Sequence, residues 1–220
     1  MDKDNFFKNS FLLTSSNIAT GILGFIFSIY LSKILGPEGM GLYNLVMPIY
    51  NLFICLMSAG IVASISKISA VYSQRGEHNN ITKTIRVVTI FNVVWALFIG
   101  IIVFSSAPFI GKYGVNDTRT ISAIRVICPA MICIAISNIF KGYFYGTSKI
   151  TVPAIIDIFE KAMRIVTVSL LIFLTQAHTL EGMVTLATVA LCIGEFQSLF
   201  FLYIYYKYSI KKMPVSFERP

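Results

Sequence analysis

Long apolar runs alternate with short polar or glycine-marked breaks along the whole chain. Each run is continuous over roughly 20 or more residues, whereas strands of a membrane barrel alternate over about ten residues. Because every backbone amide needs an internal partner in hydrocarbon, continuous runs of this length predict membrane-crossing α-helices. The predicted fold is all-α, with six transmembrane helices at residues 11–35, 43–72, 87–106, 121–145, 153–175 and 183–206.

The segment Leu35–Tyr72 organises this pattern, because it opens with a turn and continues as an apolar run. Three glycines and a proline occur between Gly36 and Gly41, which predicts a tight turn between the first two helices. Pro48 lies one turn inside the second run and is expected to kink it. The remaining runs are separated by similarly short connections, and the one before residue 87 is predicted as a basic polar loop with Arg75, Lys83 and Arg86.

Composition supports a polytopic membrane protein. The 220 residues are 56% hydrophobic and 13% charged, with mean hydropathy +0.76, against about 25% charged residues in soluble domains. The net charge of +8 sits at helix ends, which indicates topology signals rather than nucleic-acid binding. With residues 1–10 and the basic tail 207–220 inside, twelve Lys and Arg side chains are cytoplasmic and four external. Both termini are therefore predicted to be cytoplasmic in a multi-pass membrane protein.

The fifth run carries the least ordinary pattern. Its first half contains four charged residues within roughly 100° of one another on a helix, and only residues 165–175 are free of charge. Eleven residues cannot cross about 30 Å of hydrocarbon, so the charged turns must lie partly at membrane depth. Two i,i+4 ion pairs are predicted, Asp157–Lys161 and Glu160–Arg164. These pairs either neutralise one another near the interface or line a cavity that meets a lipid head group.

Two further runs contain polar candidates. Glu195 lies near the middle of the sixth run, where a carboxylate is either structural or a proton- or ion-coupling site. Asn17 lies on a face of small residues in the first run, which is either a helix-packing face or the polar wall of a cavity. Lys67 is expected to reach the interface from the second run.

No cofactor or metal is predicted. The four cysteines all sit in apolar runs, and His78 and His178 are isolated in predicted loops. The chain has no Ser/His/Asp set, HExxH motif or P-loop, so an enzyme is the least favoured function class.

The residues around the first turn resemble a known family. Four stretches resemble the first hairpin of one flippase branch. They are Leu-Gly-Pro-Glu-Gly-Met-Gly-Leu-Tyr at 35–43, Met-Pro-Ile-Tyr at 47–50, Ser-Ala-Gly-Ile at 58–61 and Ala-Ser-Ile-Ser-Lys at 63–67. That branch contains the stage V sporulation protein B and polysaccharide-exporter proteins of the multidrug/oligosaccharidyl-lipid/polysaccharide (MOP) flippase superfamily. A second match is Lys-Gly-Tyr-Phe-Tyr-Gly at 141–146, followed by Pro153, Glu160 and Arg164.

The resemblance implies one six-helix lobe of a MATE-like fold, in which two lobes surround a cavity that opens alternately to each side. It also implies export of an undecaprenyl-linked oligosaccharide or peptidoglycan precursor for polysaccharide, cell-wall or spore-cortex synthesis in the bacterial cytoplasmic membrane. Such a cavity needs a second lobe, either beyond residue 220 of the same chain or from another copy.

One departure from the branch concerns the cations. Relatives that handle lipid-linked precursors often carry basic residues in the first span, and none occurs in Gly21–Ser28. A pyrophosphate needs cationic partners, and the remaining candidates are Lys67, Lys161 and Arg164. With Asn17, Asp157 and Glu160 they form the predicted substrate-binding set. The alternatives are a cation-coupled multidrug exporter, although no carboxylate lies in residues 11–35, and a membrane scaffold protein without transport.

Overall fold

The computed structural model describes residues 3–175 and 179–212, and it is helical throughout apart from short connections. Its elements are α1 (Lys3–Ser58), α2 (Ile61–Arg75), α3 (His78–Phe109), a π-helical turn (Ile110–Gly114), a 3-10 turn (Thr118–Thr120), α4 (Ile121–Gly146), α5 (Thr151–Thr175) and α6 (Leu180–Lys211). The all-α prediction is confirmed for these residues. Of the predicted tail, residues 207–211 belong to α6, and 213–220 lie outside the described residues, as does His178.

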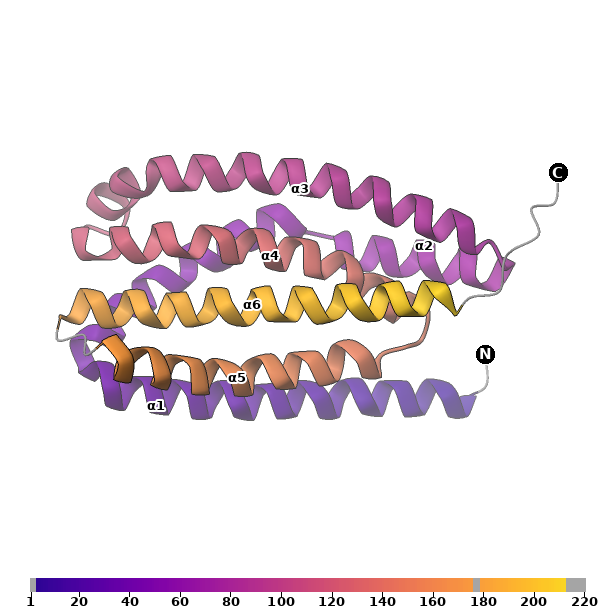
Figure 1. Cartoon of the computed structure of the whole chain (residues 1–220), viewed down its shortest axis with the longest axis horizontal. Helices are drawn as coiled ribbons and strands as arrows, with labels where there is room; N and C mark the ends of the chain where they lie inside the picture. Colours follow the sequence, from indigo (N-terminus) through magenta and orange to yellow (C-terminus); the bar gives the residue numbers. More distant parts are fainter. Residues whose placement is uncertain (1–2, 176–178, 213–220) are drawn as a thin grey trace.

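The element α1 consists of two helical arms that meet at Gly36. There the backbone turns to φ 67°, ψ −178°, while Pro37 begins the second arm. Glycine adopts this conformation without a Cβ clash, and proline suits the first turn of a helix. In Figure 1 the first arm runs along one edge of the bundle, and the second arm crosses back behind the other helices. The predicted turn is confirmed, but it is confined to one residue, because residues 37–41 are helical.

The second predicted run breaks at a different place from the one expected. The backbone stays helical at Pro48 and departs from the helix at Gly60, which has φ 75° and separates α1 from α2. The predicted basic loop is also mostly helix. Arg75 ends α2, Lys83 and Arg86 lie in α3, and only two residues connect these helices.

Four described segments are long and apolar enough to cross a membrane, namely Ser10–Arg75, His78–Gly114, Thr118–Gly146 and Leu180–Lys211. The first of them includes both arms of α1. Helix α5 has 25 residues but is not in this set. Its four charged residues are the reason, which agrees with the expectation that this helix cannot cross by its apolar part alone.

Helix α4 is the centre of the bundle. It packs against α2, α3 and α6, while α5 lies between α6 and α1 (Figure 1). The Lys-Gly-Tyr-Phe-Tyr-Gly motif at 141–146 forms part of the contact between α4 and α2. A Cβ on Gly146 would lie 2.3 Å from the carbonyl oxygen of Ser66, so only glycine lets the two backbones approach this closely. Tyr143, inside the same motif, is fully buried and shares a hydrogen bond with Ser209 of α6.

Candidate functional site

A buried ion-pair cluster joins α5 to α6. Glu160 and Arg164 lie one turn apart on α5, and both face Glu195 of α6. Arg164 Nη2 donates to Glu160 Oε1 and, at 3.2 Å, to Glu195 Oε1. All three residues are less than 10% exposed. The predicted Glu160–Arg164 pair is confirmed, and Glu195 belongs to the same network.

Two neighbours complete the cluster. Lys161 Nζ lies 3.0 Å from Glu160 Oε2, and the hydroxyl of Tyr50, on the second arm of α1, donates to Glu195 Oε1 at 3.3 Å. Two carboxylates are thereby matched by two cations. Gly194 makes room for this arrangement, because a Cβ there would lie 2.7 Å from Glu160 Oε1. The carboxylate of Glu160 thus occupies the space that a side chain at position 194 would need.

The predicted Asp157–Lys161 pair is wrong. Asp157 instead contacts Lys141 of α4, with 2.7 Å between Oδ1 and Nζ, while Lys161 turns to Glu160. This contact forms because the Lys141 side chain on α4 reaches Asp157 on α5. The sequence pattern of α5 alone could not show this contact. The Lys141 side chain is only 17% exposed.

The charged residues border a cavity of about 230 Å³. Its wall contains the three acidic and two lysine side chains together with small polar groups from α1 and α6: Thr20, Lys141, Asp157, Glu160, Lys161, Glu195 and Ser198, with Ile134. Thr20 and Ser198 were not predicted. Thr20 belongs to a row of small side chains at four-residue spacing in the first run, namely Ser16, Thr20, Gly24, Ser28 and Ser32, and this row is the sequence signal that could have found it.

Two predicted residues lie apart from this cavity. Asn17 is exposed and is not part of the cavity wall. Lys67 is exposed on α2, where it borders a separate hollow of about 240 Å³ together with Arg75. The structure thus brings together Asp157, Glu160, Lys161, Arg164 and Glu195 out of the seven predicted residues.

The cavity wall offers carboxylate, ammonium and hydroxyl groups for charged contacts and hydrogen bonds. Among the described residues, no three His, Cys, Asp or Glu side chains are placed to hold a metal ion together. His78 is the first residue of α3 rather than part of a loop. The Nε of Arg164 is buried without a hydrogen-bond partner within the described chain. The N–H of Nε is therefore a donor that the two carboxylates, which both contact Nη2, do not use.

The fold and the buried charges define a polytopic helical membrane protein with ion pairs inside its helix bundle. In such proteins, charges at membrane depth pair with one another and mark transport pathways. Residues 6–218 match the family described as polysaccharide biosynthesis protein. The chain belongs to this family, within the MOP flippase superfamily that the 35–43 motif indicated.

Three curated relatives from Bacillus subtilis (strain 168) are similar to this chain. Stage V sporulation protein B is 31% identical over 94% of the chain and 40% of its own length. Lipid II flippase MurJ is 25% identical over 90% of the chain and 39% of its own length, and sporulation protein YkvU is 25% identical over 91% and 43%. The chain thus spans about two fifths of the length of these relatives. No solved structure matches it significantly.

Proposed function

We propose that this chain forms one six-span lobe of a flippase, which moves an undecaprenyl-linked oligosaccharide or peptidoglycan precursor across the bacterial cytoplasmic membrane. The observation that carries the proposal is the polar cavity at the charged turns of α5 in a member of this family. Two lysines border that cavity, and the pyrophosphate of such a precursor needs cationic partners in a medium of low dielectric constant. Recognition and translocation require no bond to be made or broken, so the chain acts as a transporter rather than an enzyme.

The two α5 cations have different roles in this proposal. Arg164 is held by two carboxylates and is buried, which makes it a positioning residue for Glu160 and Glu195. Lys161 is about one third exposed, and Glu160 is its one ion-pair partner among the described residues, so within the cavity it is the first cation to reach a phosphate. Lys141, held by Asp157, is the second.

The other predicted residues take places outside the cavity. Lys67, in the hollow near Arg75, is proposed to meet the head group before it enters. Asn17 is exposed on the first arm of α1, as are Asn44 and Asn51 on the second. Polar side chains at membrane depth face water or protein. A second six-helix lobe, from the same chain beyond residue 220 or from another copy, would therefore close the central cavity over these asparagines.

We propose that the chain crosses the membrane six times, with both termini in the cytoplasm. Each arm of α1, the second continued by α2, counts as one crossing. Helices α3 to α6 supply the other four, with α5 crossing by virtue of its buried ion pairs. The start of α1 and the end of α6 lie at the same end of the bundle (Figure 1), as an even number of crossings requires.

A precursor-flipping assay tests this function. The full-length protein is reconstituted in vesicles, and the accessibility of a labelled lipid-linked precursor is followed over time. Lys161→Gln should slow flipping at least tenfold, because one charge-assisted contact to the phosphate is lost. Lys207→Gln, at the exposed end of α6, is the matched control. Unaltered flipping by Lys161→Gln in correctly inserted protein contradicts the role of Lys161, and no flipping by the unmodified protein favours the scaffold alternative.

Buried Glu195 favours a second candidate, a cation-coupled multidrug exporter. A carboxylate with an arginine and a tyrosine as partners is suited to exchange a proton or a cation. Drug efflux that depends on pH or sodium, and that Glu195→Gln abolishes without affecting precursor flipping, would establish this function. Precursor flipping that Glu195→Gln makes insensitive to pH and sodium would instead assign Glu195 to energy coupling of the flippase.

A further inference from the structure

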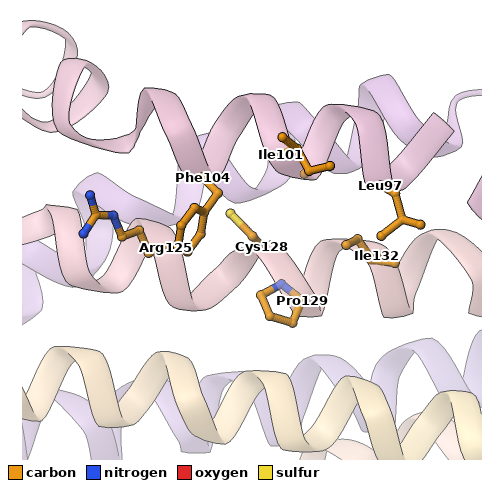
Figure 2. A pocket seen from close by; sticks show the side chains of 8 residues that line it. Leu97, Ile101, Phe104, Arg125, Cys128, Pro129 and Ile132 are labelled. Carbon is orange, nitrogen blue, oxygen red and sulfur yellow. The ribbon is translucent and has the colours of Figure 1, made fainter. Parts of the chain in front are cut away.

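A second cavity lies between α3 and α4 and shares no residue with the charged one. It measures about 290 Å³ and is bordered by two helical rows that face each other, Leu97 to Phe104 on α3 and Arg125 to Ile132 on α4. Both rows have the i, i+3, i+4, i+7 spacing of one helix face. Figure 2 shows Leu97 beside Ile132 at one end of the groove and Phe104 beside Arg125 at the other. The groove therefore runs parallel to the helices for about 10 Å.

The wall of this groove is apolar except at one end. Leu97, Ile101 and Phe104 are each between 46% and 65% exposed, so the α3 side opens toward the lipid-facing surface. Gly100, between them, lets Ile132 pack closely against α3, because a Cβ there would lie 3.2 Å from Ile132 Cδ1. A groove that is apolar, parallel to the membrane-crossing helices and open sideways fits an acyl chain rather than a soluble ligand.

The one charge in the groove is Arg125. It is exposed, lies above the ring of Phe104 with 5.5 Å between Cζ and the ring centroid, and has no carboxylate within ion-pair distance among the described residues. By contrast, Arg119, at the same end of the bundle, forms ion pairs with Asp117 and Glu38. Arg125 lies about one turn inside the start of α4 at Ile121, which places its charge near the end of the membrane-crossing part.

We propose that the α3–α4 groove is a binding site for an anionic membrane phospholipid. One acyl chain lies between Leu97 and Ile132, and the phosphate accepts hydrogen bonds from the guanidinium of Arg125. A phospholipid places its phosphate at the membrane boundary and its chains along the helices, which is the arrangement of charge and apolar surface in this groove. The site is separate from the proposed flippase cavity, and it holds a resident lipid against the outer face of the lobe.

Native mass spectrometry of the full-length protein tests the proposal. Three lipids are titrated in separate experiments: palmitoyl-oleoyl-phosphatidylglycerol, the phosphatidylcholine with the same chains, and undecaprenyl phosphate. The expected result is a saturable phosphatidylglycerol adduct that Arg125→Gln weakens about tenfold, since a charge-assisted contact is lost. Arg119→Gln, the matched control at the same end of the bundle, should leave this adduct unchanged. Leu97→Trp, which fills the groove, should remove the adduct, and Ile101→Phe is the milder variant if that protein does not fold.

Several results would overturn the proposal. Equal affinity for phosphatidylcholine and phosphatidylglycerol would remove the role of Arg125, and so would equal losses in Arg119→Gln and Arg125→Gln. Tighter binding of undecaprenyl phosphate in the same groove would assign the site to the precursor. Dimers that Leu97→Trp abolishes, without a lipid adduct, would assign it to a second copy of the chain. Because Arg125→Gln leaves the charged cavity intact, its lipid result is distinguishable from the flipping result of Lys161→Gln.

Discussion

Two regions of this molecule place one arginine between two carboxylates, and they do so in opposite surroundings. Arg164 lies between Glu160 and Glu195 inside the bundle, with side chains 5–10% exposed. Arg119 lies between Asp117 and Glu38 at the end of the bundle, where the side chains are 20–63% exposed. The composition of the two triads is nearly the same, so their difference isolates the effect of burial.

Burial changes what each triad requires. One arginine cannot neutralise two carboxylates, and around Arg119 water and salt ions screen the remaining charge. Around Arg164 the protein itself must supply the compensation, and it does so with Lys161 and the hydroxyl of Tyr50. Removing one partner of a buried pair leaves an uncompensated charge in a medium of low dielectric constant. The buried triad is therefore expected to respond strongly to every substitution and the exposed triad weakly.

The largest effect is expected from Arg164→Gln. This change leaves Glu160 and Glu195 facing each other without their common cation, and we expect a loss of about 3–5 kcal/mol in the free energy of unfolding. The measurement is denaturation by SDS in mixed micelles, followed by circular dichroism. Adding Glu195→Gln to the same protein should recover part of the loss, because Arg164 is the one cation within ion-pair distance of Glu195 among the described residues, whereas Glu160 keeps Lys161. A loss in the double variant equal to the single one would contradict this account.

Gly194→Ala should give the next largest effect. Its Cβ would lie 2.7 Å from Glu160 Oε1, and that carboxylate cannot turn away without giving up Arg164 or Lys161. We expect a loss of about 1–3 kcal/mol in the free energy of unfolding, as for other overpacked sites. Gly21→Ala is the control, since no atom lies within 4 Å of its Cβ position. If both alanines have the same effect, the tight fit around Glu160 does not determine stability.

The sequence predicted the fold more fully than the site. Continuous apolar runs and the glycine-proline turn require only local rules, so the helices and the reversal at Gly36 could be predicted. The i,i+4 pair Glu160–Arg164 followed from helix geometry in the same way. The partners from other helices could not be predicted. Lys141 reaches Asp157 and Tyr50 reaches Glu195 because of how α4 and α1 pack, and periodicity within one helix carries no information about that packing.

A smaller effect is expected from Tyr50→Phe. The substitution keeps the buried ring and removes only the hydroxyl that donates to Glu195 Oε1 at 3.3 Å. Because this hydrogen bond is long and Glu195 keeps Arg164, we expect a loss of about 1 kcal/mol in the free energy of unfolding. Tyr205→Phe, on the exposed side of α6, serves as control and should change nothing measurable. A null result for Tyr50→Phe would mean that Arg164 alone satisfies Glu195.

The smallest effect is expected at the exposed triad, from Arg119→Gln. Its hydrogen bonds to Asp117 hold the pKa of that carboxyl below the ordinary value. A lowered pKa in the folded protein stabilises it at neutral pH, and this contribution is lost as pH falls through the lowered pKa. The difference in unfolding temperature between the unmodified protein and Arg119→Gln should therefore be slight, constant above about pH 5, and smaller still below about pH 4.

The same difference in unfolding temperature should also shrink in 1 M salt, where charges are screened within about 3 Å. A difference that grows on acidification, or that matches the effect of Arg164→Gln, would show that exposure does not separate the two triads.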